Sequence, residues 1–142
     1  MIRPLSLIDV KIIRELYESD FPDGWSKTQL LGAFNTNRFV AFGSFFKDEL
    51  VGVITISLGY DDADLEGIVV RNDFRRNKIA TSLLEFALEY ARKEKKQKIF
   101  LEVRESNISA IEFYSKNGFN EISVRKNYYP NGENAKIMVK EL

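Results

Sequence analysis

The stretch IVVRNDFRRNKIATSLLEFAL, residues 68–88, runs from an apolar segment through a basic turn into an amphipathic segment. Its first residues, Ile68, Val69 and Val70, are β-branched and favour a strand. Further on, apolar residues recur three or four positions apart and predict a helix from about residue 78 to 93; they are Ile79, Leu83, Leu84, Ala87, Leu88 and Ala91. A strand therefore leads directly into a helix at the turn.

The turn carries more positive than negative charge. It holds one acid, Asp73, and the cations Arg71, Arg75, Arg76 and Lys78. Cations at a helix N-terminus oppose the helix dipole, whereas the free N–H groups there, like arginine side chains, bind anions. These groups together indicate a phosphate-binding turn. A solvated basic turn is the alternative that composition alone leaves open.

The chain has 142 residues, of which 44% are hydrophobic. A chain of this size buries enough surface for one core, so we expect a single domain over residues 1–142. No apolar run approaches the roughly 20 residues of a membrane span. The first ten residues lack a basic segment followed by an apolar one, so we expect no secretory signal. A cytoplasmic protein without a membrane partner is the expectation.

Charge and residue usage exclude several classes of function. Lys plus Arg and Asp plus Glu both number 21, so no overall field favours nucleic acid. The absence of Cys and His excludes thiol nucleophiles, Ser-His-Asp triads, disulfides and zinc sites built from thiolates or imidazoles. We therefore expect no metal. In an enzyme, carboxylates, Tyr, Lys and backbone groups would have to carry the chemistry.

The remaining elements follow from periodicity and capping residues. We expect a strand at residues 2–5, a helix from Ser6 to about residue 19, a loop at 21–25, and a short second helix that Ser26 and Gln29 begin as a capping box. Trp25 in that loop is more often a packing residue than a ligand contact, although we place it on the substrate side. Further strands are expected at residues 38–46, 50–58, 65–70, 99–104, 119–124 and 135–139, with a helix between Asn107 and Gly118. This order predicts a mixed sheet covered by helices.

Several polar residues in the second half could do chemistry. Glu102 is an acid inside the alternating strand IFLEVR, where desolvation would suit it to proton transfer. Pairing with Arg104 or a nearby lysine is the alternative. Tyr114 lies on the apolar side of a short helix and is either a core residue or an acid. Tyr128 and Tyr129 flank a Pro-Asn-Gly turn, where they could staple the hairpin or clamp a peptide.

Three segments of the chain resemble the GCN5-related N-acetyltransferases, the GNAT superfamily. RRNKIA, residues 75–80, resembles their acyl-CoA pyrophosphate loop, [QR]xxGx[GA], with Lys78 where glycine is usual. LEVRESNISAIEFYSKNGF, residues 101–119, and RKNYYPNGENAKIM, residues 125–138, resemble segments of the bacterial ribosomal-protein-alanine N-acetyltransferases. Trp25 and Ser26 stand where that branch has a Pro-Trp-Ser loop, with Gly24 in place of proline.

The resemblance implies an α/β (α+β) GNAT fold, in which about four helices flank a mixed, mostly antiparallel sheet of about seven strands. It implies acetyl-CoA as cosubstrate without a metal, Glu102 as general base and Tyr114 as general acid. On the same ground we expect the protein substrate near Trp25, Tyr128 and Tyr129. The residues expected at acetyl-CoA are Ile68, Val69, Val70, Arg75, Arg76, Asn77, Lys78, Ile79, Ala80, Thr81 and Asn107.

The expected reaction is direct acetyl transfer to the N-terminal α-amine of a protein, a small-subunit ribosomal protein being the expected substrate. Direct attack is expected because the chain has no Cys or His to form an acyl intermediate. One rival is a GNAT enzyme for a small amine or an antibiotic, which would not need the Tyr-Tyr-Pro loop. The other is a non-catalytic acyl-CoA-binding module. Lys78 in place of glycine favours this alternative, whereas the presence of Glu102 and Tyr114 argues against it.

Overall fold

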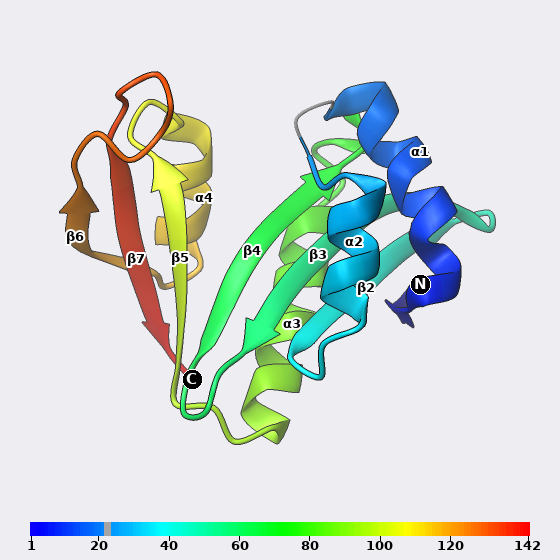
Figure 1. Ribbon diagram of the computed structural model, residues 1–142, viewed down its shortest axis with the longest axis horizontal. Helices are drawn as coiled ribbons and strands as arrows, with labels where there is room; N and C mark the ends of the chain where they lie inside the picture. Colours follow the sequence, from blue (N-terminus) through cyan, green and yellow to red (C-terminus); the bar gives the residue numbers. More distant parts are fainter. Residues whose placement is uncertain (22–23) are drawn as a thin grey trace.

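The computed structural model describes residues 1–21 and 24–142 (Figure 1). Its elements follow the predicted order, and the predicted strands end within two residues of the observed ones. Two residues of the expected loop at 21–25, residues 22 and 23, lie outside the described part. The strands are β1 (Ile2–Leu5), β2 (Phe39–Phe46), β3 (Glu49–Leu58), β4 (Ala63–Val70), β5 (Lys98–Arg104), β6 (Asn120–Arg125) and β7 (Ala135–Glu141). The helices are α1 (Val10–Asp20), α2 (Lys27–Phe34), α3 (Ile79–Lys93) and α4 (Ile108–Lys116), with short 3-10 turns η1 (Leu7–Asp9) and η2 (Asn72–Phe74).

The seven strands form one sheet in the order β1-β2-β3-β4-β5-β7-β6. All neighbouring strands are antiparallel except β4 and β5, which are parallel and pair only at Ala63 with Ile99 and at Asp64 with Phe100. Beyond these two pairs the strands diverge, and Figure 1 shows the resulting V, closed near the C-terminus. The backbone edges of β4 and β5 that face the open part of the V do not pair with each other.

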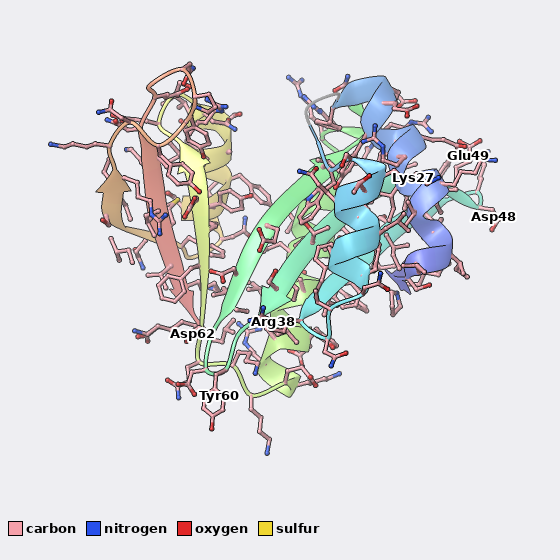
Figure 2. All side chains as sticks on the ribbon, viewed as in Figure 1. Lys27, Arg38, Asp48, Glu49, Tyr60 and Asp62 are labelled. Carbon is pink, nitrogen blue, oxygen red and sulfur yellow. The ribbon has the colours of Figure 1, made fainter. Side chains whose placement is uncertain are left out.

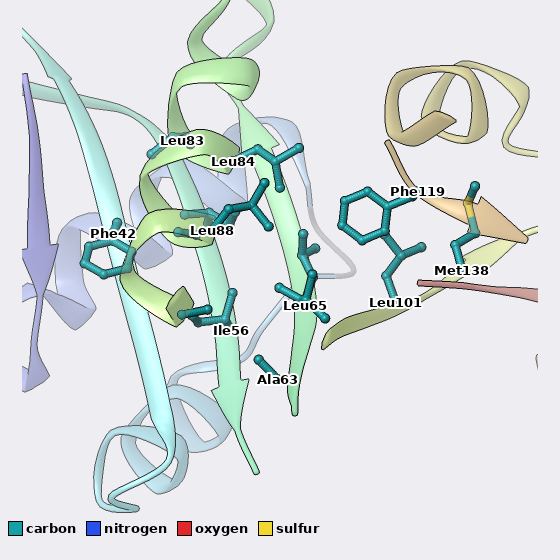
Figure 3. Packing of buried hydrophobic residues seen from close by; sticks show 14 of the residues in the cluster. Phe42, Ile56, Ala63, Leu65, Leu83, Leu84, Leu88, Leu101, Phe119 and Met138 are labelled. Atoms are coloured by element: carbon teal, nitrogen blue, oxygen red, sulfur yellow. The ribbon is translucent and has the colours of Figure 1, made fainter. Parts of the chain in front are cut away.

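Helices cover the sheet unequally. In Figure 1, α1 and α2 lie in front of β2 and β3, while α3 and α4 lie behind the sheet. The apolar stripe of α3, which the helical spacing predicted, is buried and packs on β2, β3 and β4. Phe119 with Leu101 continues this core toward β5 (Figure 3). Burying a leucine or phenylalanine contributes about 1.5–3 kcal/mol. The back of the sheet therefore holds the two arms of the V together, whereas no described helix covers the front of β5.

Hydrogen bonds fasten the closed end of the V. The Gln97 amide donates to the Asp61 carbonyl at 2.8 Å, and the Leu142 amide donates to the Gln97 carbonyl at 2.9 Å. Tyr60 and Asp62 lie at this end, in the turn between β3 and β4 (Figure 2). The opposite end is left open. None of the helices in the described parts of the chain is long and apolar enough to cross a membrane.

Candidate active site

The turn between β4 and α3 has unusual backbone geometry. Arg76 and Lys78 have φ angles of 68° and 59°, in the left-handed region that favours glycine. Such residues cost on the order of 1–3 kcal/mol each, and they persist where the surroundings fix them. Lys78 thus stands in a backbone conformation that glycine adopts readily. The first bond of α3 runs from the Ser82 amide to the Lys78 carbonyl at 3.0 Å, so the amides just before Ser82 point out of the helix end.

A cavity of about 830 Å³ lies at this helix end, between the end of β4 and α4. We call it the cofactor cavity. The residues that line it are Phe21, Ile68, Val70, Phe74, Arg75, Arg76, Lys78, Ile79, Ala80, Thr81, Asn107, Ser109, Ala110, Phe113, Tyr114 and Lys116. The structure therefore brings together most of the residues that the sequence assigned to acetyl-CoA, together with Tyr114.

Two of the expected residues turn their side chains elsewhere. The side chain of Val69 packs against the core beneath α1 and α2, because alternate residues of β4 face opposite sides of the sheet. Asn77 donates from Nδ2 to the Phe74 carbonyl at 3.3 Å and lines a separate hollow near Met1. The Asn77 side chain therefore lies outside the cofactor cavity, although the resemblance placed Asn77 with its neighbours at acetyl-CoA.

Sequence reasoning missed Lys116 and the phenylalanines of the cofactor cavity. Lys116 follows one helical turn after Phe113 on α4, a spacing that places both on one face. The cavity thus combines four cations and a helix N-terminus with apolar rings. This donor set fits a molecule that carries phosphates on an apolar arm.

Tyr114 lies half-buried in the cofactor cavity. Its ring packs against Phe113 and Phe119, with centroids 5.4 and 5.6 Å away. Burial raises the pKa of Tyr114 to about 12. That pKa lies well above the value of about 8.5 for a thiol, so the phenol would not readily give its proton to a thiolate. The phenol stays protonated and is a better hydrogen-bond donor than proton donor.

Asn107 caps α4, as the sequence predicted. Its Oδ1 accepts hydrogen bonds from the Ala110 amide at 3.2 Å and from Ser109 Oγ at 3.3 Å. Gly118 follows the helix with φ of 92°, the left-handed conformation that often ends a helix. The cap places the Asn107 side chain at the cofactor cavity.

Glu102 lies on the opposite face of β5. Ile99, Leu101 and Val103 are buried on the side of α3 and α4, so the alternation of the strand turns Glu102 to the front. The expectation that Glu102 is desolvated was wrong, because its side chain keeps 33% exposure. Glu102 stays exposed because the described helices cover β5 only on the back of the sheet.

A second cavity, of about 620 Å³, surrounds Glu102; we call it the acceptor cavity. Arg125 Nη1 lies 3.5 Å from Glu102 Oε1, so Glu102 pairs with an arginine of β6 and not with Arg104. Tyr128 stands beside the same carboxylate, which raises the pKa of the Tyr128 phenol, mainly by hydrogen bonding. The cavity is lined by Asp64, Leu65, Glu66, Phe100, Leu101, Glu102, Arg125, Tyr128, Tyr129 and Ile137.

The acids of β4 in the acceptor cavity were not predicted. Burial raises the pKa of Asp64, and the charges of Glu66, Glu102 and Asp62 raise it further. Glu66 accepts a hydrogen bond from Ser57 Oγ at 2.7 Å. The alternation of acids along β4 was the available signal, because Asp64 and Glu66 lie two residues apart and so share the front face.

Trp25 is both a packing residue and a lining residue. Its ring lies 5.2 Å from the Phe39 ring, and its carbonyl accepts a hydrogen bond from Arg14. It also lines a hollow of about 320 Å³ that includes Asp64. Because Asp64 lines the acceptor cavity as well, Trp25 lies on the same side of the sheet as Glu102.

Tyr128 and Tyr129 project from the loop between β6 and β7. Their rings lie 5.1 Å apart, edge to face. Tyr129 packs under Arg104 at 4.0 Å, and its amide donates to the Glu133 carbonyl at 3.1 Å. Tyr128 is 46% exposed. Tyr129 therefore fastens the loop, while the ring of Tyr128 stays partly exposed beside Glu102.

Comparison with known proteins agrees with this architecture. The model of the acetyltransferase (GNAT) family matches residues 10–119, and the chain belongs to this family. It is 30% identical over 128 residues to the ribosomal protein bS18-alanine N-acetyltransferase of Salmonella typhimurium, a match that covers 83% of this chain and 86% of that protein. The predicted superfamily and the predicted sheet with its helices are thus confirmed.

Solved structures show the same likeness over nearly the whole chain. The ribosomal-protein-S18-alanine N-acetyltransferase from Escherichia coli matches with a TM-score of 0.91 and 28% identity, over 99% of this chain and 92% of that one. Ard1 from Thermoplasma volcanium matches with a TM-score of 0.88 and 25% identity, over 100% and 97%. Among the described residues, no group of three or more His, Cys, Asp or Glu side chains could hold a metal ion.

Proposed function

We propose that the protein transfers the acetyl group of acetyl-CoA to the N-terminal α-amine of a ribosomal protein, in particular one of the small subunit. The observation that carries this proposal is the pair of cavities on opposite faces of the sheet, beside the point where β4 and β5 separate. One is cationic and apolar, and the other presents a carboxylate. The names of the Salmonella and Escherichia coli relatives support the protein substrate.

The cofactor cavity would take the CoA part of the cosubstrate. Arg75, Arg76 and Lys78 would face its phosphates at the N-terminus of α3. The apolar side chains of Ile68 and Phe113 would contact its arm. The thioester would then lie at the split between β4 and β5, within reach of the acceptor cavity.

Glu102 would act on the amine. An N-terminal ammonium with a pKa of about 7.7–8 is partly charged near neutral pH and must lose a proton before it attacks. Glu102 would take that proton directly or through a water. The neutral nitrogen then forms a bond to the acetyl carbon, the carbon–sulfur bond breaks, and the electron pair leaves with the sulfur. The nitrogen gives up its second proton to solvent as the amide forms, and the thiolate takes up one proton.

Tyr114 would stabilise the departing sulfur from the opposite face of β5. Its phenol stays neutral up to high pH because burial raises its pKa to about 12. The hydroxyl can therefore donate a hydrogen bond to the thiolate throughout the working range. Final protonation of a thiol with a pKa of about 8.5 needs no strong acid near neutral pH.

The enzyme's domain organisation, its location and the approach of its substrate belong to the proposed function. We propose that residues 1–142 act as one acetyltransferase domain in the cytoplasm, without direct contact to nucleic acid. Its balanced charge of 21 cations and 21 anions offers no overall field for nucleic acid. The substrate would approach between Trp25 and the two tyrosines. We expect small first residues such as Ala or Ser, because larger ones would compete with these rings for space.

A peptide panel tests the proposed function. CoA release is measured with N-terminal peptides, with lysine peptides whose N-terminus is blocked, and with polyamines. The proposal predicts that the unblocked peptides react fastest, and among them those that begin with Ala or Ser. A preference for polyamines would replace the proposal with a small-amine acetyltransferase. Acetyl-CoA binding without transfer to any amine would indicate a binding module.

A further inference from the structure

Arg125 reaches the carboxylate that the proposed function assigns to the substrate amine. Glu102 of β5 and Ser123 of β6 both pair with Ile137 of the strand between them, and Arg125 follows Ser123 by two residues. Residues two apart on a strand share a face. The Arg125 side chain therefore lies over β7 on the front of the sheet and extends toward Glu102.

The ion pair between Arg125 and Glu102 is loose. The two charged atoms are 3.5 Å apart, and the side chains are 58% and 33% exposed. The guanidinium carbon of Arg125 lies 5.4 Å from the centre of the Tyr128 ring. Exposed pairs of this kind change an equilibrium by at most about fivefold. The contact is therefore easily displaced by a second cation.

Arg125 lies at an exposed edge of the sheet. It ends β6, the outermost strand, which pairs with β7 alone and is exposed throughout. The side chain can swing away from Glu102 without breaking the core, because its contacts with Glu102 and Tyr128 lie at the partly exposed surface of the sheet.

We propose that Arg125 is a positioning residue that occupies Glu102 in the absence of substrate and is displaced when the substrate ammonium arrives. This inference rests on the proposed role of Glu102. The guanidinium and the ammonium are both cations with N–H donors, so they compete for the same carboxylate oxygens. Arg125 therefore weakens amine binding and keeps the carboxylate in place until a matching amine replaces it.

The test compares Arg125→Gln, Arg125→Lys and a control, Lys126→Gln, at the neighbouring exposed position. We expect Arg125→Gln to lower the KM for an N-terminal peptide by roughly two- to fivefold, the range of an exposed pair. The KM for acetyl-CoA and kcat stay unchanged, because Arg125 has left Glu102 before the chemistry. Arg125→Lys keeps a competing cation and stays close to the parent, and Lys126→Gln matches the parent.

The outcomes separate this inference from the proposed function. A KM for the peptide that is unchanged or raised in an active Arg125→Gln variant overturns the inference and leaves the proposed function intact. A parent protein that acetylates no amine overturns the proposed function. Calorimetry with the unacetylated peptide then still decides the inference, because tighter binding by Arg125→Gln than by the parent supports it and equal or weaker binding overturns it. Thermal melting of each variant shows that it is folded.

Discussion

Two sets of residues on the front of the sheet each combine a glutamate, an arginine and a tyrosine, but with different geometry. The Glu102 set contains Glu102, Arg125 and Tyr128, and the Glu133 set contains Glu133, Arg104 and Tyr129. In the Glu133 set, Arg104 lies 3.1 Å from the carboxylate and 4.0 Å from the ring. The corresponding distances in the Glu102 set are 3.5 and 5.4 Å.

The difference lies in how many donors each carboxylate has. Glu133 also accepts a hydrogen bond from the Ser106 amide at 2.8 Å. Hydrogen bonds from Ser106, together with Arg104 and Asn131, lower the pKa of Glu133 to about 2. The Glu133 carboxylate thus bonds to Ser106 and Arg104, and it joins the β6–β7 loop to the segment before α4. Glu102 has fewer partners and remains approachable, which is what a base for an external amine requires.

The largest expected effect is on kcat, and it distinguishes Glu102 from Glu133. Glu102→Gln should lower kcat on the order of 10²- to 10⁴-fold, the range for loss of a general base, and should leave acetyl-CoA affinity unchanged. Glu133→Gln, the matched control, should retain most of its turnover. CoA release with saturating substrates measures both. Near-parental turnover of Glu102→Gln on a mostly protonated amine would remove Glu102 from the mechanism.

A smaller loss of turnover is expected from Tyr114, on the other face of β5. Tyr114→Phe should lower kcat on the order of 10- to 100-fold, less than a complete general acid contributes, because the phenol supplies a hydrogen bond rather than an essential proton. Tyr17→Phe is the control, since burial also raises the pKa of Tyr17 to about 12 at a site outside both cavities. If Tyr114→Phe loses thermal stability but no activity, Tyr114 is a core residue.

The Glu133 set predicts acid sensitivity of the fold. The pKa of Glu133 falls from 4.5 to about 2 on folding, so its contribution to stability is present above pH 4.5 and is lost as the pH falls toward 2. Urea unfolding midpoints across this range should therefore fall less steeply in Glu133→Gln than in the parent. Identical pH profiles for the two proteins would show that the hydrogen bonds to Glu133 do not stabilise the fold.

The smallest effect concerns the cofactor cavity, which lies outside both sets. Lys78→Gly keeps a backbone with φ of 59° that glycine adopts readily. It should weaken CoA binding roughly two- to fivefold at low salt, and the difference should vanish at high salt, where exposed charges are screened. The KM for the peptide should not change. If Lys78→Gly binds CoA as tightly as the parent at both low and high salt, Lys78 points into solvent.

The sequence predicted local features of this fold well. Capping by Ser26 and Asn107 and the helical stripe on residues 79–91 depend on neighbours in the chain. The same holds for the front-facing position of Glu102, which follows from strand alternation. The turn at Lys78 was recognised from six residues, although lysine replaces the usual glycine.

The environment of these residues could not be predicted in the same way. The exposure of Glu102 depends on which face of β5 the helices cover, and the raised pKa of Tyr114 depends on the burial of its ring, which packs against Phe119. Arg125 lies 23 residues from Glu102 and reaches it across β7. Such a contact follows from the strand order β5-β7-β6, which the order of the elements in the sequence does not specify.

The central claim is that the acceptor cavity receives the end of a protein chain. One peptide sequence with a single internal lysine tests it most directly, prepared with a free N-terminus and with a blocked one. Mass spectrometry should place the acetyl group on the α-amine of the free peptide and find the blocked peptide unreacted. Acetylation of the lysine in the blocked peptide, as fast as the free peptide reacts, would contradict the claim.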